Sequence, residues 1–249
     1  MSESPVHLFG GDDPEMLIAH AVARANFRYL WREIVRDRGR IVPALEMAAV
    51  KAPFSDPKPR FSLKKQPQVE HMWISDVDFD GQNVTGTLIN SPNWLKSVKE
   101  GDDVSIPLAQ ISDWMFATDD EVYGAFTVNL LRSRMEPGER REHDQAWGLD
   151  FGDPAKPRKV SEKSHQELEK TVILLFEEHF ANDPDSLDDR GHLGWTALHS
   201  NASAGGAAIV GLLLEKGADR AIKTDLGFTA LDLAKILGWK EVIPLLEGN

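Results

Sequence analysis

Thr196-Ala197-Leu198-His199 and Thr229-Ala230-Leu231-Asp232 stand 33 residues apart, and the residues that follow them match as well. The first quartet leads to a leucine-rich segment at residues 209–214, and the second leads to a similar segment at residues 242–246. A period of this length is typical of a repeated pair of helices, because each unit buries its apolar side only against a neighbour. The sequence therefore predicts a stack of helix pairs in its last third.

The geometry of a repeated helix pair explains why particular residues stand at each position of the repeat. Gly194 and Gly227 permit a tight turn before the first helix of each pair, and Thr196 and Thr229 are suited to cap that helix. Gly217 stands where a left-handed residue ends the second helix. With these features, residues 189–246 resemble two ankyrin repeats. Ankyrin stacks present surfaces and carry no chemistry of their own, so the resemblance implies that another protein is bound.

Two repeats rarely stand alone, because about three are needed to bury a continuous core. Residues 162–180 are the best candidate to cover the open end. Apolar side chains recur there at helical spacing: Leu168, Val172, Leu175, Phe176 and Phe180. We expect a capping helix that also joins the repeats to the rest of the chain.

Aromatic side chains mark the places where ankyrin turns project. Trp195 and Phe228 follow the repeat glycines, and Trp239 follows the glycine between two helices. Together with Asp225 and Leu226, they form the predicted partner-binding set, since exposed aromatic residues are favoured interface anchors. In the alternative interpretation, these aromatic residues pack on the capping helix or on the preceding domain.

Composition narrows the possible functions. The 249 residues include no cysteine, which excludes disulfides, thiolate catalysis and cysteine-bound zinc. The net charge of −12 argues against nucleic acid as a ligand and makes a basic protein one of the partners that fit. No apolar run is long enough to span a membrane and no secretion signal is recognised, so a cytoplasmic location is expected. The oligomeric state stays open.

Residues 13–36 predict a long amphipathic helix, with Asp13 as its cap and Pro14 in its first turn. Beside its apolar side runs a stripe of arginines at four-residue spacing: Arg24, Arg28, Arg32 and Arg36. As a functional feature, this stripe would bind an anion or a partner. Otherwise it is a solvated flank paired with acidic residues such as Glu33.

The sequence predicts a series of short strands in the middle of the chain. Prolines and basic residues at positions 53–67 indicate a loop or linker. Beyond it, two-residue alternation predicts strands at residues 76–80, 84–89, 104–106, 111–117 and 122–131, with a short helical turn at residues 92–98. The predicted fold class is therefore α+β: a long helix packed on a small antiparallel sheet or partial barrel, followed by an all-α ankyrin tail.

Several short segments of this part of the chain together match the sequence pattern of a known family. They are Trp31-Arg32-Glu33, Arg40-Ile41-Val42-Pro43, Met72-Trp73-Ile74-Ser75-Asp76-Val77, Ile111-Ser112-Asp113-Trp114-Met115 and Trp147-Gly148-Leu149. Residues 14–154 resemble the bacterial family called domain of unknown function 2314, which recurs upstream of ankyrin repeats. The resemblance implies a bacterial cytosolic protein of two parts, and it assigns no activity and no catalytic residue.

Two motifs suggest chemistry. Asp76-Val77-Asp78-Phe79-Asp80-Gly81 reproduces the first half of an EF-hand calcium loop, but Thr87 stands where the bidentate glutamate is needed. His143 and Asp144 resemble a fragment of a metal or acid–base site, but no second histidine stands at zinc spacing and Pro137-Gly138 indicates an exposed loop. We therefore predict no metal and no cofactor.

The predicted organisation is an α+β domain at residues 1–155, a capping helix and linker at residues 156–188, and two ankyrin repeats at residues 189–249. The favoured function is a non-enzymatic protein that binds another protein, one form of which is an immunity protein that neutralises a bacterial toxin. The alternative is an enzyme that acts on a small molecule through its α+β domain. It would use Asp76, Asp78, Asp113, His143 and the arginine stripe, converging in one pocket.

Overall fold

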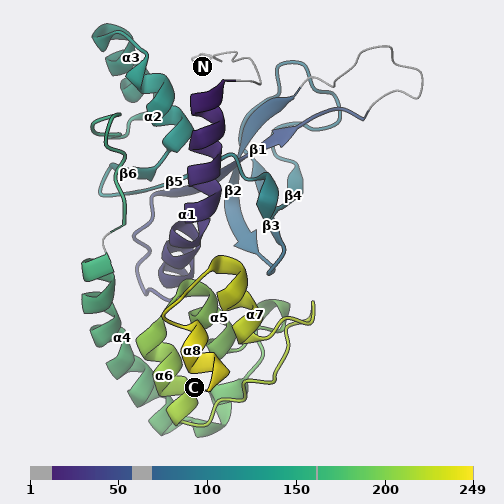
Figure 1. Ribbon diagram of the computed structural model, residues 1–249, viewed down its shortest axis with the longest axis vertical. Coiled ribbons are helices and arrows are strands. Elements are labelled where there is room, and N and C mark those ends of the chain that lie inside the picture. The colour runs from purple at the N-terminus through teal and green to yellow at the C-terminus, as the bar shows by residue number, and fades with distance from the viewer. Residues whose placement is uncertain (1–12, 58–68, 161, 249) are drawn as a thin grey trace. The chain divides into compact units, whose positions relative to one another are not determined.

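The computed structural model describes residues 13–57, 69–160 and 162–248, with the side chains of residues 162–166 and 168 left out. The chain separates into two compact units (Figure 1). Unit 1 comprises residues 1–30 and 42–159, and unit 2 comprises residues 31–41 and 160–249. Helix α1 (Pro14–Arg38) thus contributes its first residues to unit 1 and its last residues to unit 2.

Unit 1 contains an antiparallel sheet with the strand order β4-β3-β2-β1-β5-β6. Its strands are β1 (Met47–Phe54), β2 (Glu70–Phe79), β3 (Asn83–Leu88), β4 (Asp103–Pro107), β5 (Asp113–Thr118) and β6 (Glu121–Gly124). Every neighbouring pair is antiparallel, which confirms the α+β class with a long first helix. The central strand β1 ends at Phe54, inside the segment 53–67 that was predicted as a loop or linker. Residues 58–67 of that segment lie outside the described residues.

The two faces of the sheet are covered differently. Trp114 donates a 2.9 Å hydrogen bond from its indole nitrogen to the carbonyl of Ala23, and Phe27 meets the ring of Phe79 edge-on at 5.8 Å. Helix α1 therefore lies on the face that carries Trp114 and Phe79. Because side chains alternate along a strand, neighbours such as Trp73 and Met115 point to the other face. They form a second core there with residues that include Val122, Val128 and Phe151.

A bulge in β2 explains the pattern of its acidic residues. The pairing with β3 shifts between Ser75 and Asp78, and Asp76 adopts a left-handed backbone with φ of 51°. The extra residue reverses the alternation, so that Val77 and Phe79 lie on the same face as Ile74. Both are buried there, as their two-residue spacing predicts. Gly86 lies opposite the bulge, where a Cβ atom would stand 2.1 Å from the carbonyl oxygen of Ser75. Only glycine allows this approach.

The predicted strand at residues 122–131 is correct only at residues 122–124 and wrong beyond them. Strand β6 ends at Gly124, and helix α2 (Phe126–Ser133) follows. The carboxylate of Asp113 starts this helix by accepting hydrogen bonds of 2.9 Å from the amide of Phe126 and 2.8 Å from the amide of Thr127. The cap comes from a residue 13 positions earlier, so local periodicity could not reveal it.

Helix α3 (Pro137–Trp147) occupies the region that was predicted as an exposed loop. Pro137 stands at its first position, where a missing amide hydrogen costs nothing. Residues 92–98, predicted as a short helical turn, form bends instead. The carboxylate of Glu70 accepts from the amides of Asn93 and Trp94, and Asp56 accepts from those of Lys96 and Ser97.

Unit 2 is helical. Helix α4 (Glu162–Asn182) packs on α6 (Ala207–Glu215), and α5 (Ala197–Ala204) packs on both α6 and α7 (Ala230–Leu237). Helix α8 (Ile243–Glu247) packs on α7 and α6. The α4 helix was predicted from apolar spacing, and Phe180 is buried as expected. Leu175, however, is 62 % exposed, and so is its neighbour Leu174 at 64 %.

The last turns of α1 supply part of the core of unit 2. Trp31 is 1 % exposed, donates a 3.0 Å hydrogen bond to the hydroxyl of Ser203, and meets Trp195 edge-on at 6.1 Å. Trp239 donates a 2.7 Å hydrogen bond to the carbonyl of the same Ser203. Gly205 makes room for this indole, since a Cβ atom there would stand 2.5 Å from the Trp239 ring.

Candidate functional site

The two ankyrin-like segments of unit 2 cap their first helices in the same way. Thr196 precedes α5, and the ring of His199 accepts from the Thr196 amide at 3.2 Å. Thr229 precedes α7, and the carboxylate of Asp232 accepts from the Thr229 amide at 2.8 Å. The helices also end alike, at Gly205 and Gly238, both with left-handed backbones. The two segments therefore share one local geometry.

The turns that precede these helices are joined to each other. The first contains the short 3-10 turn at His192–Gly194, and the second spans residues 224–228. The amide of Asp225 donates a 3.0 Å hydrogen bond to the carbonyl of Leu193, and the Asp225 carboxylate lies 2.7 Å from the guanidinium of Arg190. We call this pair of turns, residues 190–194 and 223–228, the turn edge.

Hydrogen bonds within each turn fix its shape. The Gly191 amide donates to the Trp195 carbonyl at 2.8 Å, and the Thr224 amide donates to the Phe228 carbonyl at the same distance. Gly194 has a left-handed backbone, and a Cβ atom there would collide with the side chains of Arg190 and Asp225. The turn edge therefore presents its side chains from a defined backbone.

The structure places the predicted partner-binding residues of this region in two groups. Asp225 is exposed, Leu226 is 54 % exposed at the tip of the second turn, and Phe228 is half-buried. Trp195 and Trp239 are 9 % and 4 % exposed and pack inside unit 2. Leu226 therefore offers a large apolar side chain that stays accessible, whereas the two tryptophans belong to the core of unit 2.

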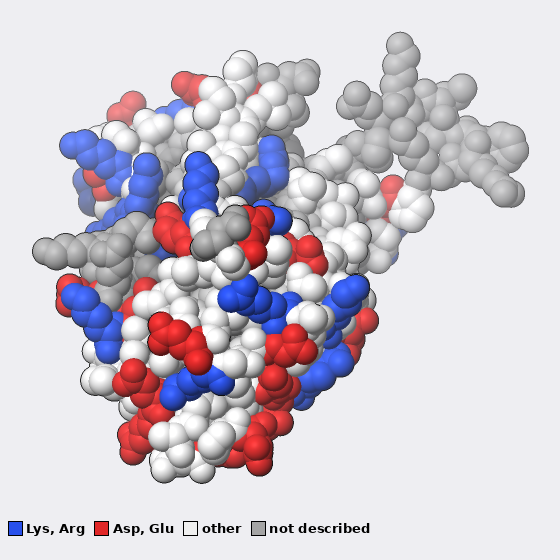
Figure 2. Space-filling view, turned by 60° about the horizontal axis from the view of Figure 1, so that its bottom comes forward, with Lys and Arg blue, Asp and Glu red and all other residues white. Residues whose placement is uncertain are grey.

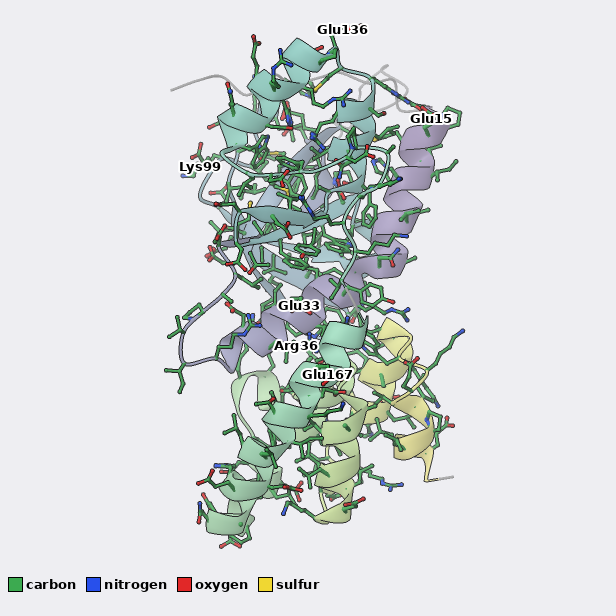
Figure 3. The ribbon with its side chains drawn as sticks, turned by 90° about the vertical axis from the view of Figure 1, so that its left-hand side faces the viewer. Glu15, Glu33, Arg36, Lys99, Glu136 and Glu167 are labelled. Carbon is green, nitrogen blue, oxygen red and sulfur yellow. The ribbon has the colours of Figure 1, made fainter. Side chains whose placement is uncertain are left out.

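The arginine stripe divides along α1. Arg24 is exposed and donates from its guanidinium to the carbonyl of Ile111 at 3.1 Å, and Arg28 is half-buried with its guanidinium 4.9 Å from the Tyr29 ring. Arg32 is fully buried, 5.3 Å from the ring of Trp239. Arg36 pairs with Glu33 at 2.7 Å (Figure 3). The four arginines thus have different surroundings, and pairing with Glu33 occurs as the alternative interpretation predicts.

The acidic and histidine motifs have separate structural partners. Asp113 is fully buried and caps α2, and the exposed Asp76 lies 3.1 Å from the hydroxyl of its neighbour Ser75. His143 lies 2.9 Å from the carboxylate of Asp144. Within residues 13–57, 69–160 and 162–248, no hydrogen bond or ion pair joins Asp76, Asp113 and His143 to one another, and no group of three or more potential metal ligands occurs.

Sequence reasoning missed the partner of Asp144. The buried Arg132 donates to both carboxylate oxygens of Asp144, at 2.8 and 2.7 Å, and its guanidinium lies 5.1 Å from the ring of Phe151. Arg132 also donates to the carbonyl of Gly152 at 3.0 Å. These contacts fasten α2 to α3 and to the segment that follows, and no local signal at Arg132 indicates them.

The two titratable groups that take part in the helix caps of unit 2 have lowered pKa values. Burial lowers the pKa of His199, whose ring lies between Thr196 and the carbonyl of Ile222 at 3.1 Å. Hydrogen bonds from Thr229 lower the pKa of the Asp232 carboxyl. His199 is thus a neutral structural residue that accepts on one ring nitrogen and donates from the other.

Charge is mixed over the surface that Figure 2 shows, where acidic and basic side chains alternate with uncharged ones. On that view, the negative net charge does not gather into one continuous patch. Among the helices of the described residues, none combines the length and the apolar character that a membrane crossing needs.

Comparison with known proteins identifies both parts of the chain. Residues 13–151 match the family described as "uncharacterized protein conserved in bacteria (DUF2314)", and residues 193–225 match the ankyrin repeat. The chain belongs to this DUF2314 family and carries an ankyrin repeat in unit 2, as the resemblances predicted.

Individual relatives cover different parts. A protein of Neisseria meningitidis serogroup B, named as a putative ankyrin repeat protein, is 40 % identical over 99 % of this chain and 98 % of its own length. Escherichia coli YegJ is 32 % identical over 33 % of this chain and 48 % of its own length. The human NAD-capped RNA hydrolase NUDT12 is 42 % identical over 26 % of this chain but only 14 % of its own length.

Proposed function

We propose that this chain is a non-enzymatic binding protein that holds another protein on the turn edge of unit 2. The ankyrin repeat and the similarity to an ankyrin repeat protein along nearly the whole chain favour protein–protein interaction as the general function. The observation that carries the choice of surface is the hydrogen bond from the Asp225 amide to the Leu193 carbonyl. It joins the two turns through their backbones and leaves the exposed side chains available to a partner.

The chemistry of the turn edge indicates what it would accept. Leu226 offers an apolar anchor, and Arg190, Lys223 and Asp225 surround it with charges of both signs. An interface of this kind has an apolar centre with a polar rim. We propose Leu226 as the anchor, Asp225 and Phe228 as its flanks, and Trp195 and Trp239 as the support beneath them.

A toxin-neutralising role is the more specific form of this proposal. The chain belongs to a bacterial family, its net charge is −12, and such a charge speeds the encounter with a basic partner. We place this role in the bacterial cytoplasm. Its test is co-expression with a toxin encoded beside it: the protein is expected to co-purify with the toxin and to restore growth. Failure of both against every neighbouring toxin would remove this specific form and leave the general one.

The general proposal is tested by photo-crosslinking in the native host. A photoreactive amino acid at Leu226 of the full chain is expected to capture a discrete partner. The matched control is the same amino acid at Leu174, which is as exposed but lies on α4. Capture at position 174 but not at position 226 would move the interface elsewhere, and capture at neither would contradict the proposal.

A further inference from the structure

Helix α4 closes one end of unit 2 and carries exposed leucines there. It packs on α6 and on the short 3-10 helix at Pro184–Asp188, and Figure 1 shows it at the margin of the helical unit. The helix that ends a repeat stack normally has a polar outer side, because no further repeat covers it. Leu174 and Leu175 depart from this rule, since they are 64 % and 62 % exposed.

Seven exposed residues of α4 form one continuous face. With about 3.6 residues per turn, they lie within about 140° of the helix circumference. They are Glu167, Lys170, Thr171, Leu174, Leu175, Glu178 and Ala181. On the opposite side of the helix, Glu169 and Phe180 are buried. We call the seven exposed residues the α4 face.

The charges on the α4 face are ordered about Leu174. Lys170 stands four positions before this leucine, and Glu178 stands four positions after it. The Lys170 ammonium lies 2.9 Å from the carboxylate of Glu167, but both side chains are exposed, and an exposed pair of this kind contributes little. Lys170 can therefore reach a second carboxylate, and Glu178 forms no ion pair among the described residues.

This order of charges is complementary to itself when two copies of α4 pack antiparallel. Around a twofold axis at the level of Leu174, a residue four positions before the leucine faces the residue four positions after it in the other copy. Lys170 of each copy then lies opposite Glu178 of the other, and the two Leu174 side chains meet at the centre. A parallel pair would instead place lysine beside lysine and glutamate beside glutamate, and these like charges repel each other.

We propose that the α4 face binds the same face of a second copy of this chain, so that two antiparallel α4 helices join the protein into a twofold dimer. The leucines supply the apolar centre of the interface, and the two ion pairs between Lys170 and Glu178 set the direction of the helices. A single helix face buries a small area, so the dimer is expected to be weak, with a Kd of about 10 µM or more. The α4 face shares no residue with the turn edge.

Analytical ultracentrifugation of the full chain tests the dimer. Between about 1 and about 200 µM, the average mass is expected to rise from one chain towards two. Leu174→Asp should weaken association about tenfold or more, because it places two like charges at the centre of the interface. Leu226→Asp on the turn edge is the matched control and should associate like the unchanged protein. A mass of one chain throughout, or equal association of the two variants, would overturn the proposal.

Charge reversal tests the antiparallel pairing. Lys170→Glu brings two carboxylates together at both ends of the interface and should weaken association about tenfold at low ionic strength. Adding Glu178→Lys to the same chain restores two pairs of opposite charge, so the double variant should associate nearly as well as the unchanged protein. Both positions are exposed, so the fold is expected to stay intact. A double variant that associates no better than Lys170→Glu alone would contradict the antiparallel dimer.

Photo-crosslinking identifies the occupant of the α4 face. A photoreactive amino acid at Leu174 of the full chain is expected to join two copies of the protein, and both crosslinked peptides should come from α4. Leu226 is the matched position, where a crosslink between two copies is not expected. If position 174 captures a different protein, or unit 1 of the same chain, in place of a second copy, the α4 face has another occupant and the proposal is wrong.

Discussion

The indole nitrogen of Trp31 donates a 3.0 Å hydrogen bond to the hydroxyl of Ser203, a residue 172 positions later in the chain. Ser203 also accepts, through its carbonyl, the indole hydrogen of Trp239. The end of α1 and the ankyrin-like helices therefore share one buried hydrogen-bond network. The missing neighbour that a short repeat stack requires is supplied in part by the first helix of the protein.

Replacing Trp31 is expected to destabilise unit 2. Trp31→Ala leaves a large cavity and should cost about 3–5 kcal/mol, whereas Trp31→Phe loses mainly the hydrogen bond and should cost about 1 kcal/mol. Chemical denaturation with hydrogen exchange of the α5 amides as the readout measures both. Leu17→Ala, on an exposed part of the same helix, is the control and should change stability by less than about 0.5 kcal/mol. Equal losses in Trp31→Ala and Leu17→Ala would contradict this view of α1.

Gly86→Ala is expected to destabilise unit 1. The added methyl group would stand 2.1 Å from the Ser75 carbonyl oxygen and 2.7 Å from a side-chain carbon of Ile74, so the bulge in β2 must move. A loss of about 2–4 kcal/mol is expected from such overpacking against backbone. Gly138→Ala in α3 meets nothing closer than 4.0 Å and serves as the control in the same unit. Differential scanning calorimetry of the two variants tests whether only Gly86→Ala lowers Tm.

The sequence predicted which residues form helices and strands better than it predicted which of these elements pack together. Apolar spacing indicated α1 and α4, and two-residue alternation indicated the strands from β2 to β5. The error at residues 122–131 arose because an aspartate 13 positions upstream caps α2 and Ala125 takes a left-handed backbone. Likewise, one apolar stripe runs along α1, so periodicity could not show that its last turns pack with unit 2. Non-local contacts decide both features.

The stability of unit 2 is expected to fall as the pH drops below 6.5. The pKa of His199 is lowered from 6.5 in the folded protein, so the unfolded chain takes up the proton first. The stability that neutral His199 contributes is thus present above pH 6.5 and is lost as the pH falls through its folded pKa. Protonation places a hydrogen on the nitrogen that accepts from Thr196.

His199→Gln tests this assignment. The variant should lose about 1–3 kcal/mol at neutral pH and should show a flatter pH dependence of stability below pH 6.5. The equivalent cap in the second segment uses Asp232, whose pKa is lowered from 3.8, so its contribution is lost only at more acidic pH. Denaturant titrations across this pH range separate the two caps. If the free energy of unfolding depends on pH in the variant as it does in the unchanged protein, the pH effect belongs to another group.

The candidate sites were only partly visible in the sequence. The 33-residue period located the turn edge, and Leu226 and Asp225 are exposed there. The aromatic residues could not be sorted in the same way, because Trp195 and Trp239 occupy equally suggestive positions yet pack inside unit 2. The stacked rings of His20 and His71 were also missed, since these residues stand 51 positions apart and meet only when α1 lies on the sheet.

Leu226→Asp is expected to weaken partner binding without unfolding the protein. Leu226 is 54 % exposed, so its replacement should change stability by less than about 0.5 kcal/mol. A buried interface anchor of this size contributes about 1–3 kcal/mol, which corresponds to roughly a 5- to 150-fold rise in Kd. Calorimetric titration with the partner that photo-crosslinking identifies measures the change in Kd. Leu174→Asp on α4 is the control. A Kd that rises for Leu174→Asp and not for Leu226→Asp would place the partner on α4, because both variants remove a leucine that is more than half exposed and add the same charge.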